Sequence, residues 1–503
     1  MSLERLVGTK RALSGEQPAG KSSRHGLRIS LIALSLANLS FISAWQRRLY
    51  GTAFFSPSWS WADVVTILLN VLLLGIVFYL LLELAARVKV AGRSWDGVVY
   101  CIPLFAVSNV VRRIAFPYHG RIAELCLIFL PLAIGLSIVW FQRRLLPAVE
   151  FIVLGLAILF PINLSRLTLV AARHNPPPAL APRFRPAPPI HRVVWMIFDE
   201  MDFALSFPRR PAGLQLPEFD SFRKQSLFAT AAHQPATDTE KAVPSLISGR
   251  EIYGFPSVQK DHTLRVQFSE NAPPQEWDAA PNIFLDERAA RVNIGVVGWY
   301  LPYCRIFPAL LTDCYWEPIY SEVTDSPTFG RSFMDELDAL TPLESRVRLI
   351  QRLQHVTAAA ESMAGDRQLG LVFIHLPVPH APEIFNRYTS SISPFAVHKD
   401  WFFDNLLIAD RTLGSIRRSM QQSGSWDSSA IIVTSDHSLR QVMMAHPDPV
   451  PLVPFMVKMP GQSQGTVFTA PFSTEIVRYL IPAIQNGEVT AANLAEWMQQ
   501  HAH

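Results

Sequence analysis

The sequence has little charge and lacks several common functional signatures. Of its 503 residues only 17% are charged, against 49% that are hydrophobic, and the formal net charge is +4. It contains no zinc-finger spacing, no Walker loop and no basic stretch with interleaved aromatic residues, so we expect no nucleic-acid partner. A Gly-x-Ser-x-Gly elbow is also absent, so a nucleophile has to be sought elsewhere. With a mean hydropathy of +0.19, the chain is too apolar for a purely soluble protein.

What the chain has in excess is apolar sequence before about residue 170. Each apolar run except the third approaches the roughly 20 residues that cross a bilayer core. We expect five transmembrane helices in an all-α domain of residues 27–172, preceded by a cytoplasmic arm of residues 1–26. A cleaved signal peptide is the alternative for the first run, but the four further runs favour a polytopic domain. The runs are 27–46, 63–82, 97–111, 122–141 and 148–165.

Basic residues predict how this domain is oriented. They are concentrated in the N-terminal arm and after the second and fourth runs, which the positive-inside rule places in the cytoplasm. Arg47, Arg48, Arg112, Arg113 and Arg121 fall in loops on the other side and oppose this topology. Since the number of spans is odd, we expect the N-terminus inside and the C-terminal part outside. This corresponds to a multi-pass protein of the plasma (inner) membrane with an extracytoplasmic, periplasmic domain.

A proline-rich segment at residues 173–192 predicts an extended linker, because it cannot continue a helix. Beyond it, in residues 193–503, short β-branched runs alternate with helical patterns. This alternation favours an α/β domain with a largely parallel central sheet. We expect strands at 193–198, 292–297, 369–374 and 430–433, and helices at 346–363 and 403–420.

Cysteine is scarce, and its placement leaves one question open. Cys101 and Cys126 lie in the apolar region, whereas Cys304 and Cys314 lie in the part that we expect to be exported. Oxidation is permitted there. A Cys304–Cys314 disulfide and two ordinary buried thiols are both open from the sequence.

Acidic and histidine side chains follow two of the expected strands. Asp199 comes directly after the strand at 193–198, and Asp436 with His437 follows the strand at 430–433. Ligand sites in open sheets form at the carboxyl ends of strands, and carboxylate with imidazole suits Zn²⁺, with Mn²⁺ as the alternative. Asp199 alone would also suit a turn or a helix cap.

Further candidates lie in loops and at a helix start. His380 and His446 each lie in a proline-containing loop, where they would contact a phosphate, donate a proton or ligate a second ion, or be merely structural. Thr237 and Thr239 precede a helix-like segment that ends at Gly249. Either hydroxyl would serve as a nucleophile beside a metal ion, or both would simply cap the helix.

The order of these motifs resembles the alkaline phosphatase and sulfatase superfamily. The motifs are Phe-Asp-Glu after a strand, then Thr-Glu-Lys-Ala-Val-Pro-Ser-Leu-Ile-Ser-Gly, His-x4-His-Ala-Pro and Thr-Ser-Asp-His, spread over some 250 residues. With the preceding apolar runs, the chain resembles the membrane branch, the phosphoethanolamine transferases and lipoteichoic acid synthases. The resemblance implies an alkaline-phosphatase-like fold for the second domain.

The resemblance also implies roles for individual residues. Asp199, Thr239, Asp436 and His437 would ligate one metal ion, and Thr239 would be the nucleophile, since it stands ten residues before Gly249 and five before Pro244. His380 would act on the leaving group, and His380 with His446 would hold the donor phosphate or a second ion.

Departures from the family pattern bear on the reaction. Lys241 and Val243 replace the proline and arginine of the frame that sulfatases need for formylglycine, which disfavours sulfate-ester hydrolysis. Ser438 follows Asp-His where glycine is usual, so the local turn is in question.

The activity that the resemblance implies is transfer of a phospholipid head group. Phosphoethanolamine or phosphoglycerol would move from a membrane lipid donor to an envelope glycan or lipid acceptor through a phospho-threonine. An extracytoplasmic phosphodiesterase or sulfatase-like hydrolase is the alternative. A non-catalytic envelope scaffold is a third possibility, which would retain no metal.

Overall fold

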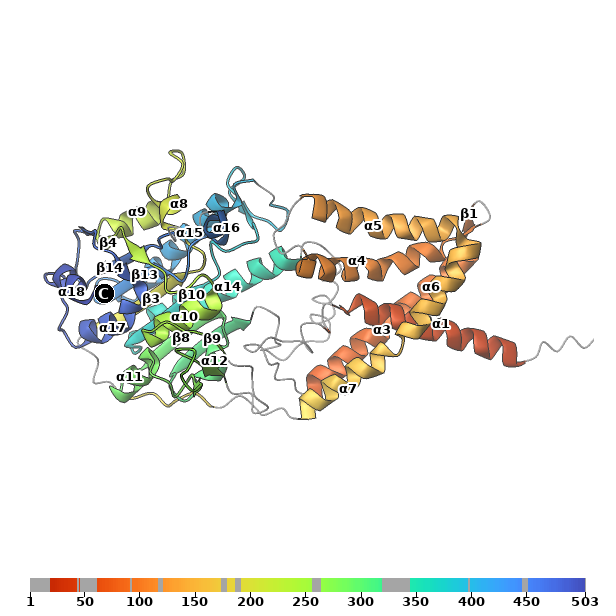
Figure 1. The fold of residues 1–503 in the computed structure, drawn as a ribbon, viewed down its shortest axis with the longest axis horizontal. Coiled ribbons are helices and arrows are strands. Elements are labelled where there is room, and N and C mark those ends of the chain that lie inside the picture. The colour runs from red at the N-terminus through yellow and green to blue at the C-terminus, as the bar shows by residue number, and fades with distance from the viewer. Residues whose placement is uncertain are drawn as a thin grey trace, which may run out of the picture. The chain divides into compact units, whose positions relative to one another are not determined.

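The protein is described by a computed structural model, in which two compact units divide at His174. The first consists of helices, and the second is built on a large sheet (Figure 1). The structure describes residues 19–42, 45, 61–90, 93–115, 121–172, 179–185, 191–255, 264–318, 344–396, 399–445 and 451–502.

The first unit contains six described helices and one short strand pair. The helices overlap the apolar runs, but the first begins at Ala19, before the run expected from residue 27, and the fifth run is shared between two helices with a turn at residues 157–158. The elements are α1 (Ala19–Ser40), α3 (Trp61–Arg87), β1 (Lys89–Val90), β2 (Arg93–Ser94), α4 (Asp96–Ala115), α5 (Arg121–Trp140), α6 (Gln142–Leu156) and α7 (Leu159–Ala172).

Within the described residues, two helical stretches are long and apolar enough to cross a membrane. They are Val64–Arg87 in α3 and Gln142–Leu169, which comprises α6 and most of α7. Shorter apolar helices occur at Asp96–Ser108 and Phe129–Trp140. The five expected spans therefore remain a prediction, supported by length and composition at two places.

The second unit is organised around an eight-stranded sheet of order β15-β4-β14-β13-β3-β10-β8-β9. Every neighbouring pair is parallel except the two pairs that β14 makes, so β14 alone runs against the rest of this sheet. The expected largely parallel sheet is confirmed, with one reversed strand. The strands are β3 (Arg192–Phe198), β4 (Leu227–Ala229), β8 (Ile294–Tyr300), β9 (Asp313–Pro318), β10 (Leu371–Leu376), β13 (Ser429–Ser435), β14 (Phe455–Lys458) and β15 (Thr466–Phe468).

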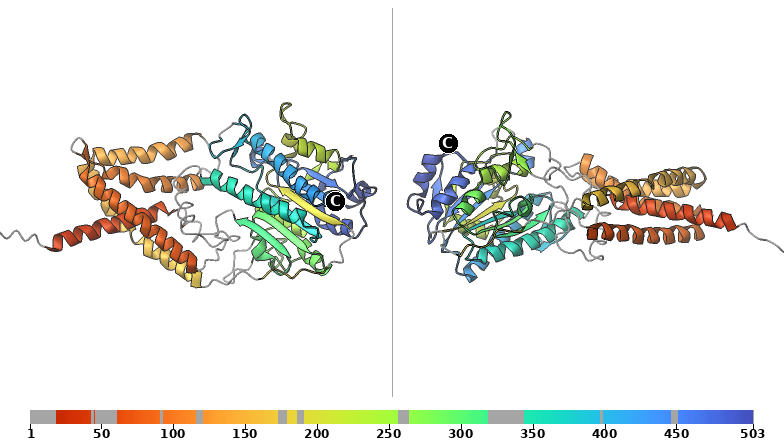
Figure 2. Two further views of the ribbon diagram at one scale, coloured as in Figure 1. Left: turned by 180° about the vertical axis from the view of Figure 1, so that it is seen from behind. Right: turned by 90° about the horizontal axis from the view of Figure 1, so that it is seen from below.

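Helices cover both faces of this sheet, which is why its central strands are apolar on both sides. Along β3, Val193, Trp195 and Ile197 face one core and Val194, Met196 and Phe198 face the other. The first core includes residues of α10 (Thr239–Ser248), α11 (Ile283–Ala289), α12 (Tyr303–Ile306), α17 (Val477–Gln485) and α18 (Leu494–His501). The second includes residues of α8 (Phe203–Ser206), α9 (Pro217–Arg223), α14 (Glu344–Gly365) and α15 (Trp401–Gln422). Figure 2 shows α14 and α15 across the face that is hidden in Figure 1.

Small elements complete the second unit. The expected helices 346–363 and 403–420 lie inside α14 and α15. The strands expected at 292–297 and 369–374 each begin two residues later, and they end three and two residues later, respectively. The remaining elements are β5 (Ala232–His233), β6 (Arg265–Val266), β7 (Gln275–Glu276), β11 (Phe385–Asn386), β12 (Ser391–Ile392), α16 (Arg440–Ala445), β16 (Phe472–Ser473) and η1 (Thr474–Ile476).

Candidate metal centre

Three adjacent parallel strands bring the candidate ligands to one edge of the sheet. In the sheet, β3 lies between β13 and β10 and pairs in parallel with both. Phe198 at the end of β3 is opposite Ser435 at the end of β13 and Leu376 at the end of β10. Residues at these ends and just beyond them therefore lie close together, which is where ligand sites in α/β sheets commonly form.

The group that forms there is buried, and several of its polar atoms have no hydrogen-bond partner among the described residues. Ligand atoms of Asp199, His375 and Asp436 all lie within 4.8 Å of one another, and the three side chains are fully buried. Both carboxylate oxygens of Asp199, Oδ2 of Asp436 and Nε2 of His375 have no hydrogen-bond partner among the described residues. Burying such groups unpaired costs several kcal/mol. The donor set therefore fits a divalent cation, with the carboxylate and imidazole ligands that zinc accepts.

Asp436 is oriented by the backbone around it. Its Oδ1 accepts hydrogen bonds from the backbone N–H of His437 at 2.8 Å and of Glu200 at 3.2 Å. The hydroxyl of Ser435 donates to the carbonyl of Phe198 at 2.7 Å, which ties the ends of β13 and β3 together. These bonds leave Oδ2 as the oxygen of Asp436 that is available to an ion.

His437 lies between the acidic pair and the proposed nucleophile. Its Nδ1 donates to the carbonyl of Ser438 at 2.8 Å, as the second nitrogen of a ligating histidine usually does. Its Nε2 is 3.2 Å from Oγ1 of Thr239, 3.5 Å from Oδ2 of Asp436 and 4.0 Å from Oδ1 of Asp199. His437 thus presents one nitrogen to the site and uses the other to hold its ring.

The charges of the site reinforce one another. Burial raises the pKa of Asp199. The neighbouring His380, His375 and His437 lower this pKa by more than burial raises it, so it lies below the ordinary value. For His437, burial lowers the pKa, but Asp436, Asp199 and Glu200 raise it to above the ordinary value. A ligating imidazole has to be neutral, so an ion bound at Nε2 would displace that proton.

Thr239 is the first residue of α10 and is nearly buried, with 4% of its surface exposed. The capping role in this helix belongs to Asp238, whose side chain accepts from the N–H of Lys241 at 3.0 Å. The Thr239 hydroxyl is therefore not needed as a cap and faces His437 instead. Thr237, by contrast, is exposed.

The turn after Asp436-His437 is held by Ser438, the residue that stands where the family pattern has glycine. Its hydroxyl donates to Oδ2 of Asp202 at 2.6 Å, and its N–H donates to Oε1 of Gln234 at 2.7 Å. Since Ser438 and Asp202 are both fully buried, the serine contributes a partner to this turn and does not disturb it.

His380 lies at the margin of the site. Its Nδ1 donates to the carbonyl of Ala381, and its Nε2 is 4.0 Å from Oε1 of Glu200. Its ring meets Trp299 edge-on, with the ring centroids 5.3 Å apart, and 28% of its side chain is exposed. His380 is thus partly open to solvent and near enough to influence Asp199. His446 lies outside the described residues.

His375 is not among the ligands that the sequence motifs imply. It lies inside β10, one residue before the strand ends, and it is opposite Ile197 of β3. A polar residue within an otherwise apolar buried strand is the sequence signal that would have identified it.

Comparisons with known proteins find structures but no sequence relatives. No family model and no curated protein matches the sequence. A sulfatase from Pseudoalteromonas sp. is similar, with a TM-score of 0.42, 14% identity, and coverage of 60% of this chain and 69% of that chain. The phosphonate monoester hydrolase of Agrobacterium radiobacter has a TM-score of 0.41 and 12% identity, with coverage of 60% of this chain and 78% of that chain. The lipoteichoic acid synthase LtaP from Listeria monocytogenes has a TM-score of 0.39 and 13% identity, with coverage of 60% of this chain and 73% of that chain.

These similarities concern enzymes of the kind that the motifs resemble. With identities of 12% to 14% and TM-scores below 0.5, they carry no argument about activity or substrate. What this chain does has to be inferred from its own residues.

Proposed function

We propose that this protein is a membrane-anchored, metal-dependent enzyme that transfers a phospholipid head group through a phospho-threonine at Thr239. The observation that carries the proposal is the 3.2 Å approach of the Thr239 hydroxyl to Nε2 of His437, beside the buried Asp199, His375 and Asp436. A hydroxyl beside a cation site at a helix start is suited to attack a phosphorus atom. We infer that Asp199, Thr239, Asp436 and His437 hold the ion, zinc first and manganese as the alternative.

A bound divalent ion would supply positive charge that favours the deprotonated hydroxyl and the developing phosphoryl charge. In the first transfer, Thr239 releases its proton to solvent water, its oxygen bonds to phosphorus, and the phosphorus–oxygen bond to diacylglycerol breaks. A protonated His380 gives its proton to the departing oxygen. In the second, an acceptor hydroxyl returns a proton to His380, its oxygen bonds to phosphorus, the phosphorus–oxygen bond to Thr239 breaks, and Thr239 takes a proton from solvent water. His446 would help to hold the donor phosphate.

The proposed setting is the plasma membrane, with the second unit outside the cell. Two helical stretches long enough to cross a membrane support an anchor, and the apolar runs before residue 170 support five spans with the N-terminus inside. A lipid donor and an envelope glycan or lipid acceptor are the partners that suit this position. The anchor would keep the site near its donor.

Mass spectrometry of the full chain in detergent tests the covalent step. After incubation with zinc and either phosphatidylethanolamine or phosphatidylglycerol, we expect wild type to gain a head-group phosphate on the peptide that contains Thr239. Thr239→Ala should gain none. Thr237→Ala is the matched control, because Thr237 is exposed two residues upstream, and it should behave as wild type. An adduct that persists in Thr239→Ala would overturn the nucleophile.

The same experiment separates a transferase from the alternative, an extracytoplasmic phosphodiesterase or sulfatase-like hydrolase. A hydrolase would pass the group from Thr239 to water, so free head-group phosphate would accumulate without modified acceptor. Lys241 and Val243 in place of the sulfatase proline and arginine disfavour sulfate esters. Transfer of a labelled head group to an added glycan or lipid acceptor would support the transferase.

A further inference from the structure

A buried tyrosine contacts the imidazole of His375 from the side that faces away from the acidic pair. The hydroxyl of Tyr303 is 2.9 Å from Nδ1 of His375, and both side chains are fully buried. The other ring nitrogen, Nε2, is 3.6 Å from Oδ2 of Asp199.

The space for this tyrosine is provided by a glycine on the neighbouring strand. A Cβ atom at Gly298 of β8 would lie 2.3 Å from Cε2 of Tyr303, closer than any real contact. The ring of Tyr303 also packs against Phe373 of β10, with the ring centroids 5.3 Å apart. A larger residue at Gly298 would therefore displace the phenol from His375.

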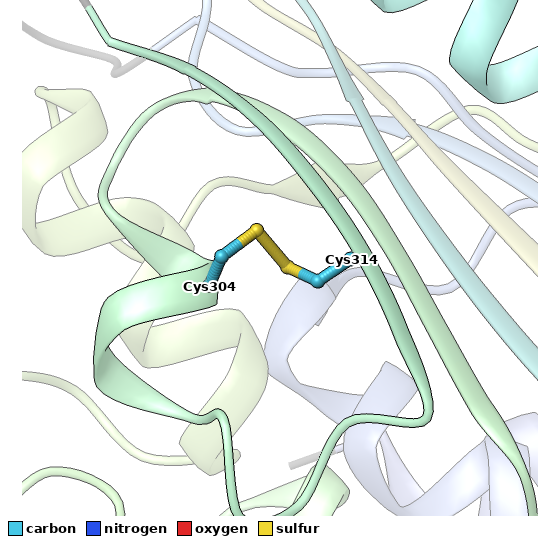
Figure 3. Close-up of a disulfide and its surroundings, with 2 residues drawn as sticks. All are labelled: Cys304 and Cys314. Atoms are coloured by element: carbon cyan, nitrogen blue, oxygen red, sulfur yellow. A yellow bond between two sulfur atoms is a disulfide. The ribbon is translucent and has the colours of Figure 1, made fainter. Parts of the chain in front are cut away.

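The backbone that carries Tyr303 is held on its other side by a disulfide. Tyr303 begins α12, and the next residue, Cys304, is bonded to Cys314 of β9. Figure 3 shows this bond joining the short helix to the adjacent strand. Of the two possibilities that the sequence left open for these cysteines, the structure has the disulfide. The N–H of Tyr303 also donates to the carbonyl of Leu301 at 2.9 Å.

We propose that Tyr303 is a positioning residue of the metal centre, which fixes the ring of His375 so that Nε2 faces the ion as an additional ligand. This inference rests on the proposed metal centre and is independent of the substrate. When Nε2 of His375 is a ligand, Nδ1 carries the proton and donates a hydrogen bond to the hydroxyl oxygen of Tyr303. Outer partners of this kind fix the tautomer and the orientation of ligating histidines.

The test is the zinc affinity of the purified full chain, measured by competition with a chromogenic chelator. Tyr303→Phe keeps the ring beside Gly298 and removes the hydroxyl, and we expect the affinity to fall about 10- to 100-fold. Tyr315→Phe is the matched control. Tyr315 lies on β9, the strand that carries Cys314, and its hydroxyl donates a hydrogen bond to Glu317 at 2.6 Å. Removing this hydroxyl should leave the zinc affinity unchanged. A cooperative thermal transition in excess chelator verifies that each variant is folded.

A double-mutant cycle distinguishes positioning from a general structural effect. His375→Gln should weaken zinc binding, and adding Tyr303→Phe to it should weaken binding no further, because the tyrosine acts through His375. Additive losses, or an unchanged affinity in Tyr303→Phe, would overturn the positioning role while the metal centre stands. A wild-type chain that binds no zinc would overturn the metal centre and with it the proposed function.

Discussion

Asp410 offers a sharp test of the structure away from the metal centre. It lies on α15 with only 3% of its surface exposed, and its Oδ1 accepts from the N–H groups of Glu218 at 3.0 Å and Phe219 at 2.8 Å in the first turn of α9. Burial raises the pKa of Asp410 to about 7, against the lowering by these two N–H groups, and the carboxylates of Glu218 and Asp220 raise it as well.

The sign and the size of the effect follow from linkage. The folded protein binds this proton more tightly than the unfolded chain, whose aspartates titrate near 3.9. The proton on Asp410 therefore contributes fully to the free energy of unfolding below about pH 4. This contribution is lost as the pH rises to about 7, and above that pH the free energy of unfolding no longer changes on account of Asp410. Since each tenfold change in proton affinity is worth about 1.4 kcal/mol, a pKa raised from 3.8 to about 7 corresponds to a loss of roughly 4 kcal/mol.

Asp410→Asn isolates the effect of the buried charge on stability. The amide oxygen of the asparagine can accept hydrogen bonds from the same two N–H groups, but the side chain cannot ionise. We expect the thermal midpoint of the variant to equal or fall below that of wild type at pH 4.5 and to gain on it up to pH 8. Between pH 4.5 and a pKa of about 7 the loss in wild type is roughly 3.4 kcal/mol, so at roughly 2 °C per kcal/mol for a large domain the relative gain is about 7 °C. Asp278→Asn, at an exposed carboxylate, is the control and should show a constant difference. A difference for Asp410→Asn that is the same at pH 5 and pH 8 would refute the reasoning.

Two further predictions concern the metal and the disulfide. Chelation should lower the thermal midpoint by the equivalent of roughly 2.7 kcal/mol when zinc had been present at 100 times its Kd. The thermal midpoint of Asp199→Ala should not change when chelator is added. A decrease as large as that of wild type would contradict the proposed metal site. Replacing Cys304 and Cys314 by serine opens a loop with a sequence separation of 10, which should cost roughly 2.5–3 kcal/mol in unfolding experiments. Cys101→Ser, at a free cysteine, is the control, and an unchanged midpoint in the double serine variant would refute the prediction.

Local sequence patterns predict four strands and two helices of the second unit, together with two acidic residues of its candidate site. The β-branched runs became β3, β8, β10 and β13 because all of them are buried on both faces, so that their apolar residues are continuous and recognisable. Asp199 and Asp436 were identified because an acidic residue at the end of such a strand stands out locally. These signals depend only on residues that are near one another in the chain.

Which of the candidate ligands contact one another depends on the tertiary structure. Asp199, His375 and Asp436 are far apart in sequence, and their contact depends on β3 lying between β13 and β10 with their ends in register. Strand order and register come from long-range pairing, which local patterns do not encode. The 3.2 Å approach of the Thr239 hydroxyl to His437 likewise depends on where α10 begins relative to the end of β13. The Cys304–Cys314 bond likewise depends on α12 packing beside β9.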